Sequence, residues 1–280
     1  MTDLSEGLRI ALAAFAARRR VLVALDFDGT LAPFVSDPMQ ARALPGGLEA
    51  LRAAAALSGV TVALASGRDL ATLGELTGMG PDDGITLIGS HGAQISRTAQ
   101  ISRTAQISGG RRAGLEPAGD APFLDDATAA RLATVRDELE AIRTRYPAVR
   151  LELKPSAVVI HTRGVEPSVA AAATKAAHEV GERHPGVHIM PGKEVVELAV
   201  LDVDKGTALL ELARDSSSDA TLYVGDDVTD ERAFAALDPL SGDLTIKVGD
   251  GETVAAQRIP NPESVVELLN LFVERRRLSG

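Results

Sequence analysis

The stretch 21-VLVALDFDGT-30 decides the fold that we expect for this chain. It opens with an unbroken apolar run, which is typical of a strand buried on both faces of a parallel sheet. Asp26 and Asp28 follow at the point where the strand is expected to end. Gly29 permits a sharp turn that brings the backbone close to a ligand. The stretch therefore predicts a buried parallel strand that delivers two carboxylates at its carboxyl end.

The same pattern, an apolar run followed by small or polar residues, recurs along the chain. The recurrences are 60-VTVALASGRD-69, 84-GITLIGSHGA-93, 220-ATLYVGDDVTDERAF-234 and 244-LTIKVGD-250. A helical segment, residues 46–58, follows the first strand. Strands that alternate with helices predict an α/β fold with a parallel sheet, in which ligands bind beyond the carboxyl ends of the strands.

A second kind of unit interrupts this pattern. Its elements read as helix, two strands, helix and two strands, over residues 125–146, 149–155, 157–163, 166–184, 187–190 and 194–200. We expect a compact α+β cap domain over residues 109–201, inserted into the first sheet. Residues 1–108 and 202–280 are then left to form a Rossmann-like catalytic core.

Composition excludes several classes of protein. The chain has 280 residues, enough for two domains, and 45% of them are apolar. No apolar run approaches the ~18 residues of a membrane span, and the segment 8–20 carries its basic cluster after its apolar part, unlike a signal peptide. The absence of cysteine excludes disulfides and suits a cytoplasmic location. A net charge of −10 argues against nucleic acid or an anionic membrane as partner.

The Asp26–Asp28 pair allows two interpretations. One carboxylate can serve as a nucleophile that forms an aspartyl-phosphate, while the other acts as general acid and base. Two acids around a turn are also simply well solvated, and for an isolated D-x-D pattern this is the more common case. The other motifs decide between these interpretations.

Further carboxylates follow a later strand. Asp226, Asp227 and Asp230 in 225-GDDVTDE-231 supply enough oxygen ligands to complete a Mg²⁺ site with the first pair. The sequence therefore predicts a magnesium cofactor bound at the strand ends.

Two segments supply the cations and donors that an anionic substrate needs. Ser66, Gly67 and Arg68 offer a hydroxyl, backbone N–H groups and a guanidinium at an expected helix start, which suits a phosphate group. Lys205, which opens another expected helix, is placed to neutralise charge that develops during phosphoryl transfer.

In this order, the motifs D-F-D-G-T, S-G-R, D-K-G and G-D-D-x-T-D resemble those of the haloacid dehalogenase superfamily of phosphatases. The insert lies where that superfamily places its larger α/β cap. More narrowly, the chain resembles the trehalose-6-phosphate phosphatase family from about residue 20 to about residue 270. The stretches that carry this closer resemblance are 26-DFDGTLAP-33, 64-LASGRD-69, 89-GSHGA-93, 192-GKEVVEL-198, 204-DKGTAL-209 and 225-GDDVTDE-231.

The resemblance implies a role for each acid. Asp26 would attack phosphorus, and Asp28 would protonate the leaving sugar oxygen and then activate water. Mg²⁺ would be held by the Asp26 carboxylate, the Asp28 carbonyl and Asp226, with Asp227 or Asp230 nearby through water or behind these ligands.

The resemblance also implies how substrate is held at the phosphate end. Ser66 and Lys205 would grip the phosphate, with Arg68 in a supporting role. His91 matches a family position near the junction of phosphate and sugar. Ser90 departs from the family, which usually has Asn there, so no substrate contact is carried over to this position.

Sugar recognition is expected in the inserted unit. Lys193 and Glu197 match the sugar-binding pair of the family, and on one strand their spacing of four places them on the same face. His161 and Arg163, two apart on an expected strand, are predicted to share a face and to join them. The alternative to sugar binding is that Lys193 and Glu197 form an ordinary ion pair. For Lys154, before Pro155, a role in the site and a plain loop position are both open.

The resemblance implies Mg²⁺-dependent hydrolysis of trehalose 6-phosphate to trehalose and phosphate. Three alternatives stay open: a related phosphatase for sucrose phosphate, mannosylphosphoglycerate or a hexose phosphate, a phosphomutase, and a non-catalytic module that binds sugar phosphates. The chain is too short to include a glucosyltransferase, so we expect any trehalose-6-phosphate synthase to be a separate partner.

One stretch lies outside these motifs. In 93-AQISRTAQISRTAQIS-108 a hexapeptide occurs twice and begins a third copy. Its period is far below the ~20 to 50 residues of stacked repeats, so it does not indicate a solenoid. It alternates like a strand, and an even period keeps each residue type on its face. We expect a 12-residue tandem duplication that lengthens a hairpin or loop where the core chain leaves for the insert.

Overall fold

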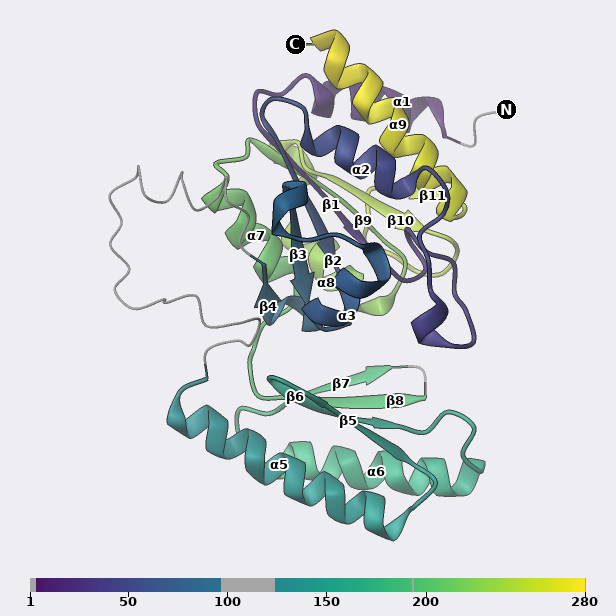
Figure 1. Ribbon diagram of the computed structural model, residues 1–280, viewed down its shortest axis with the longest axis vertical. Coiled ribbons are helices and arrows are strands. Elements are labelled where there is room, and N and C mark those ends of the chain that lie inside the picture. Colours follow the sequence, from purple (N-terminus) through teal and green to yellow (C-terminus); the bar gives the residue numbers. More distant parts are fainter. Residues whose placement is uncertain (1–3, 97–123, 193, 280) are drawn as a thin grey trace. The chain divides into compact units, whose positions relative to one another are not determined.

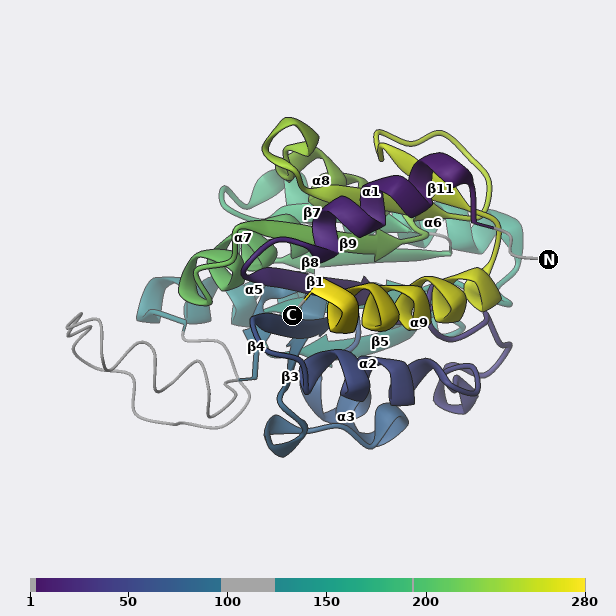
Figure 2. The same cartoon turned by 90° about the horizontal axis from the view of Figure 1, so that it is seen from above.

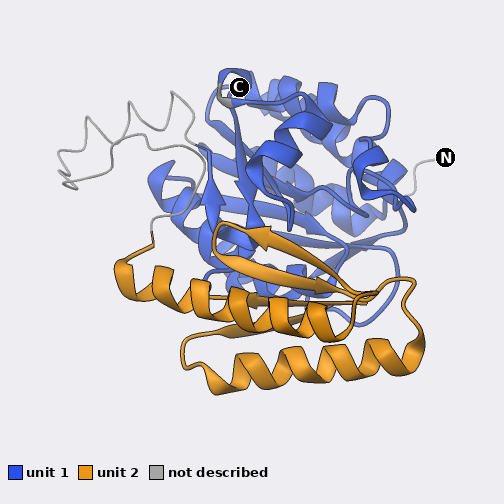
Figure 3. Ribbon diagram, turned by 60° about the horizontal axis from the view of Figure 1, so that its bottom comes forward, with its two compact units in different colours: residues 1–120, 203–280 blue, residues 121–202 orange. Residues whose placement is uncertain are grey.

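The computed structural model describes residues 4–96, 124–192 and 194–279 (Figure 1). The chain divides into two compact units, one of residues 1–120 and 203–280 and one of residues 121–202 (Figure 3). The domain boundary that we expected between residues 108 and 109 lies outside the described residues. Among the described residues, no helix combines the length and the apolar character that a membrane span requires.

A seven-stranded sheet forms the centre of the first unit. In spatial order its strands are β11 (Gln257–Ile259), β10 (Leu244–Val248), β9 (Ala220–Gly225), β1 (Val21–Asp26), β2 (Val60–Ala65), β3 (Ile85–Gly89) and β4 (Gln94–Ile95). All neighbouring pairs are parallel except β3 and β4, which are antiparallel. The predicted α/β class with a parallel sheet is confirmed.

Helices cover both faces of this sheet. The first face packs against α1 (Glu6–Ala16), α2 (Gly47–Ala55), α3 (Leu70–Thr77) and α9 (Pro262–Ser279), and the second against α7 (Lys205–Asp215) and α8 (Val228–Ala236). Figure 2 shows α2 and α9 side by side. Alternate residues of β1 enter the two cores, with Val23 in one and Leu22 in the other. This is why the strand is apolar at every position.

The order of the strands creates a switch point at β1. The chain proceeds from β1 to β2 and β3 on one side, and from β9 to β10 and β11 on the other. The register pairs Asp26 with Ala65 and Leu25 with Val224. Consequently the segments that follow β1, β2 and β9 meet at one edge, where open α/β sheets bind ligands.

The second unit contains a four-stranded antiparallel sheet and two helices. Its elements are α5 (Asp126–Arg145), β5 (Arg150–Lys154), β6 (Ala157–His161), α6 (Pro167–Arg183), β7 (His188–Gly192) and β8 (Val195–Ala199). The strand order is β5-β6-β8-β7. Both helices contribute to one apolar core, in which Leu139 and Ala177 lie with Val158 and Leu198 of the sheet. The order of helices and strands is the predicted one.

The start of the hexapeptide repeat belongs to the first unit. Its second and third residues, Gln94 and Ile95, form β4, which pairs with β3 through Ile88 and Ile95. Gln94 is buried, and its Oε1 accepts hydrogen bonds from Ser90 Oγ at 2.8 Å and from the Leu70 N–H at 3.3 Å. The expected duplication continues beyond residue 96 and lies outside the described residues.

Candidate active site

A buried lysine joins two buried aspartates at the carboxyl edge of the first sheet. Lys205 Nζ donates to Asp26 Oδ1 at 2.6 Å and to Asp230 Oδ1 at 2.7 Å, and its side chain is only 2% exposed. Lys205 is the first residue of α7, where the Asp204 carboxylate accepts a hydrogen bond from the Thr207 N–H at 2.9 Å. This N-terminal cap fixes the start of the helix and with it the origin of the lysine side chain.

Asp230 is saturated with hydrogen bonds. Its Oδ1 accepts from Lys205 and from Tyr223 Oη at 2.7 Å, and its Oδ2 accepts from the N–H groups of Asp226 at 2.9 Å and Asp227 at 3.0 Å. A carboxylate offers about four acceptor positions, and here each has a donor. Asp230 therefore holds Lys205 and the turn after β9 in place.

Asp226 is fixed through its backbone and its side chain. Its Oδ1 accepts from Thr30 Oγ1 at 3.1 Å, and its carbonyl accepts from Lys247 Nζ. Gly29, with φ of 81°, allows this approach, because a Cβ there would lie 2.2 Å from Asp226 Oδ2. The glycine of the first motif thus brings the turn after β1 against the carboxylate that follows β9.

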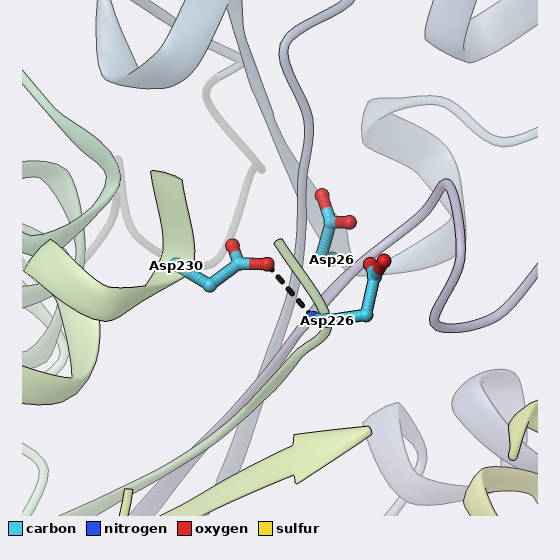
Figure 4. Close-up of side chains that lie close together, drawn as sticks. All are labelled: Asp26, Asp226 and Asp230. Atoms are coloured by element: carbon cyan, nitrogen blue, oxygen red, sulfur yellow. Dashed lines mark hydrogen bonds between the residues drawn. The ribbon is translucent and has the colours of Figure 1, made fainter. Parts of the chain in front are cut away.

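Carboxylates crowd this edge (Figure 4). Asp26, Asp226 and Asp230 each offer an oxygen within 4.8 Å of the others, the arrangement of a metal site. Burial raises the pKa of Asp26 well above its ordinary value, with Asp230 and Asp226 adding to the shift against Lys205. Burial, followed by the Asp230 and Asp227 charges, raises the pKa of Asp226 to about 6.

The remaining charges at this edge respond to the same crowding. Burial opposes charge on Asp230, yet the Lys205 cation and the hydrogen bonds to the carboxylate lower its pKa overall. Burial also opposes the Lys205 cation, but Asp230 and Asp26 raise its pKa. Lys205 contacts two of the three acids, Asp26 and Asp230, and the excess negative charge of the cluster favours an additional cation.

The segment after β2 lies beside the segment after β1. Ser66 is buried, and its Oγ accepts the Arg68 N–H at 3.1 Å. Arg68 Nε and Nη2 each donate to one oxygen of Asp28, both at 2.7 Å. Gly67 leaves room for the His91 ring, whose Cε1 would lie 2.5 Å from an added Cβ.

A left-handed turn joins three of the predicted segments. Ser90, His91 and Gly92 have φ of 50°, 55° and 112°. The N–H groups of Ser90 and His91 donate to the carbonyls of Arg68 at 2.7 Å and Ser66 at 3.0 Å. A Cβ at Gly92 would lie 2.5 Å from the Asp204 carbonyl oxygen, so the turn also packs on the start of α7.

The conformation of Ser90 gives a physical reason for the asparagine that the family resemblance implies at this position. Positive φ is uncommon outside glycine, and asparagine tolerates it better than most residues. The Ser90 hydroxyl donates inward to Gln94, so it is committed to the protein interior.

In the second unit, two predicted residues lie on one face of the sheet. The register pairs Val159 with Glu197 and His161 with Val195, so His161 and Glu197 share a face. Glu197 forms an ion pair with Lys154 at 2.7 Å, and both side chains are nearly buried. His161 Nε2 lies 2.8 Å from Glu152 Oε2.

Two predictions about this face are wrong. β6 ends at His161, so Arg163 is not on the strand. It lies in a turn in which the Val165 N–H donates to the Thr162 carbonyl at 3.1 Å. Arg163 Nε lies 3.3 Å from Glu194 Oε2. Glu197 lies on β8, which begins only at Val195, after β7 has ended at Gly192. Position 193 therefore precedes this strand, and Lys193 itself lies outside the described residues.

Three contributors to the site escaped the sequence analysis. They are Tyr223, Thr30 and Lys247, which lie within the quoted stretches without a predicted role. For Lys247 the sequence does carry a signal, because it is a lysine within the apolar run 244-LTIKV-248 and a buried cation needs a partner. Lys247 finds the Asp226 carbonyl and lies 3.7 Å from Glu231 Oε1.

Comparison with known proteins decides the family. The model of the trehalose-phosphatase family matches residues 24–260. The chain belongs to the trehalose-phosphatase family. It is 30% identical to the trehalose-phosphate phosphatase of Mycobacterium tuberculosis strain H37Rv over 99% of its own length and 68% of that protein. The family predicted from the sequence motifs is confirmed, and the relative's name is that of a phosphoric monoester hydrolase.

Solved structures show the same fold. The C-terminal domain of Candida albicans trehalose-6-phosphate phosphatase has a TM-score of 0.73 at 22% identity and covers 95% of this chain and 96% of its own. The C-terminal domain of the trehalose synthase regulatory protein of the same organism has a TM-score of 0.67 at 15% identity. This likeness covers 94% of this chain and 97% of that domain. At these identities the likeness concerns the fold alone.

Gly29→Ala should disrupt the acidic cluster. Its Cβ would overlap the Asp226 carboxylate, and its φ of 81° adds a strain of about 1–2 kcal/mol. Gly84→Ala is the matched control, since Gly84 has φ of 70° with no atom within 4 Å of an added Cβ. We expect only the variant at position 29 to lose Mg²⁺-induced thermal stabilisation. Equal loss in both variants would show that strain alone is responsible.

Asp226→Asn should stabilise the protein in the absence of divalent cations. The folded-state pKa of Asp226, about 6, lies above its ordinary value, so the stability linked to this group is present at low pH and lost as pH rises through about 6. At about pH 8 we expect the variant to gain on the order of 1–3 kcal/mol in denaturant unfolding with EDTA. At about pH 5 the gain should shrink. A gain that does not depend on pH would contradict this account.

Proposed function

We propose that this chain is a Mg²⁺-dependent phosphatase that hydrolyses trehalose 6-phosphate to trehalose and phosphate through an aspartyl-phosphate. The observation that carries the proposal is the buried Asp26 beside Lys205 at the end of β1, in a chain of the trehalose-phosphatase family. A separate synthase would supply the substrate.

The first half-reaction would transfer the phosphoryl group to Asp26. Lys205 donates to Oδ1, and Oδ2 would attack phosphorus as the bond from phosphorus to the sugar oxygen breaks. Asp28, two residues on, would give its proton to the leaving sugar oxygen. The products of this step are free trehalose and a phosphoryl group on Asp26.

The second half-reaction would release phosphate. The Asp28 carboxylate would take a proton from a water molecule while the water oxygen attacks phosphorus. The bond between Asp26 and phosphorus then breaks, so that the Asp26 carboxylate and a protonated Asp28 are restored.

The phosphate would be held by Ser66 and Lys205, beside the nucleophile. The Ser66 hydroxyl, whose oxygen accepts the Arg68 N–H, would donate to a phosphate oxygen. Lys205 supplies positive charge next to the nucleophile. His91, packed against Gly67, would lie near the junction of phosphate and sugar.

The crowding of Asp26 and Asp226 fits a divalent cation, and these two carboxylates with the Asp28 carbonyl would hold Mg²⁺. When bound, Mg²⁺ supplies positive charge that reduces repulsion between the carboxylate nucleophile and the dianionic ester. Asp230, with both oxygens occupied, would act behind these ligands. Asp227 is exposed and caps α8, so it would be a more distant contributor.

Selection of the sugar would belong to the second unit. Glu197 and His161 present polar groups on the sheet face that α5 and α6 do not cover, and Arg163 lies in the turn after β6. The alternative of a non-catalytic sugar-phosphate module predicts binding of the ester without release of phosphate. A phosphate-release assay with trehalose, sucrose and glucose 6-phosphates, with and without Mg²⁺, separates these functions.

Asp26→Asn should abolish phosphate release, because an amide is a far weaker nucleophile than a carboxylate. The thermal unfolding midpoint, measured in parallel, controls for folding. Substantial turnover by the folded variant would show that Asp26 is not the nucleophile.

Glu197→Ala and Lys193→Ala should lower kcat/KM for trehalose 6-phosphate by about 10-fold or more. The kcat/KM for p-nitrophenyl phosphate should change little, since only the first ester carries sugar hydroxyls to bind. Glu179→Ala, an exposed glutamate of α6, is the matched control. Equal losses on both esters would refute a role in sugar recognition.

A further inference from the structure

The acid that would serve as proton donor is held by a two-pronged contact. Arg68 Nε donates to Asp28 Oδ2 and Arg68 Nη2 donates to Asp28 Oδ1, each at 2.7 Å. The two residues are 40 positions apart and follow the neighbouring strands β1 and β2. Such paired hydrogen bonds fix a carboxylate in orientation as well as in position.

Arg68 is itself held firmly enough to impose that orientation. Its N–H donates to Ser66 Oγ at 3.1 Å, and its carbonyl accepts the Ser90 N–H at 2.7 Å. Its guanidinium carbon lies 6.0 Å from the centre of the Phe27 ring, and its side chain is only 14% exposed. The Asp28 side chain, at 31%, is the more exposed partner, so the anchored arginine directs the acid.

We infer that Arg68 is a positioning residue that orients the Asp28 carboxyl group for proton transfer to and from the reacting oxygens. The inference rests on the proposed function and deepens it. It differs from the phosphate-binding role that the sequence suggested for Arg68, because two of the guanidinium nitrogens already donate to Asp28.

The two roles predict different responses to the leaving group. Help from a general acid matters most when the departing oxygen is basic, as in phenyl phosphate. It matters least when the departing oxygen is a stable anion, as in p-nitrophenyl phosphate. Loss of a residue that binds the phosphate would instead lower kcat/KM for both esters alike, since their phosphate groups are the same.

Arg68→Lys separates orientation from charge. Lysine keeps the positive charge and much of the apolar stem, but it lacks the planar fork that binds both carboxylate oxygens. Arg68→Gln removes the charge as well. Arg52→Lys is the matched control, because Arg52 forms an ion pair with Asp83 at 3.1 Å elsewhere in the same unit.

The experiment compares kcat/KM for phenyl phosphate and p-nitrophenyl phosphate in these variants and in the wild type, with Mg²⁺ present. Inhibition by inorganic phosphate is measured in the same samples. For Arg68→Lys we expect a loss about 10-fold greater on phenyl phosphate, and phosphate inhibition within about twofold of wild type. The ratio of the two esters is independent of the folded fraction, because both are measured on one preparation.

Equal losses on both esters, or weakened phosphate inhibition in Arg68→Lys without a change in the ester ratio, would overturn the inference. So would a wild-type ester ratio in Arg68→Gln. A wild-type protein that releases no phosphate from either ester or from trehalose 6-phosphate would contradict the proposed function itself, which keeps the two failures distinct.

Discussion

The buried contact of Lys205 with Asp26 and Asp230 is the interaction on which the rest of the first unit depends. Each of the three side chains is ionisable and nearly shut off from water. Removing one partner from such a group typically costs about 3–5 kcal/mol, because the charge that remains is buried without compensation. The surrounding structure is therefore organised to bring the ends of β1 and β9 and the start of α7 to one point.

Much of this arrangement was predictable from sequence, because it follows from local patterns. Apolar runs that end in Asp26 and in Gly225 indicated buried strands, and parallel strands place their carboxyl ends at one edge. The grouping of acids with Lys205 then follows from the topology. These patterns involve residues close together in the chain. The switch point at β1 then brings the segments after β1, β2 and β9 to one edge of the sheet.

The parts that sequence did not reveal are contacts between distant residues and the exact ends of strands. The strand prediction for Arg163 failed because Gly164, with φ of 74°, allows a turn that a period of two does not register. The single-strand placement of the 193–197 pair failed for a similar reason, since Glu194 adopts a φ of 60° just before β8. The Arg68–Asp28 contact joins the segments after β2 and β1, and Lys247 of β10 contacts the segment after β9, so no local period encodes such partners.

The central position of β1 has a consequence for the way this unit comes apart. The strand is hydrogen-bonded on both sides, to β2 and β9, and covered by helices on both faces. Local fraying occurs at edges and termini, whereas central strands open only with the whole cooperative unit. Asp26 therefore shares the hydrogen-exchange protection of the core, and the site persists through the small fluctuations that open the peripheral strands β4 and β11.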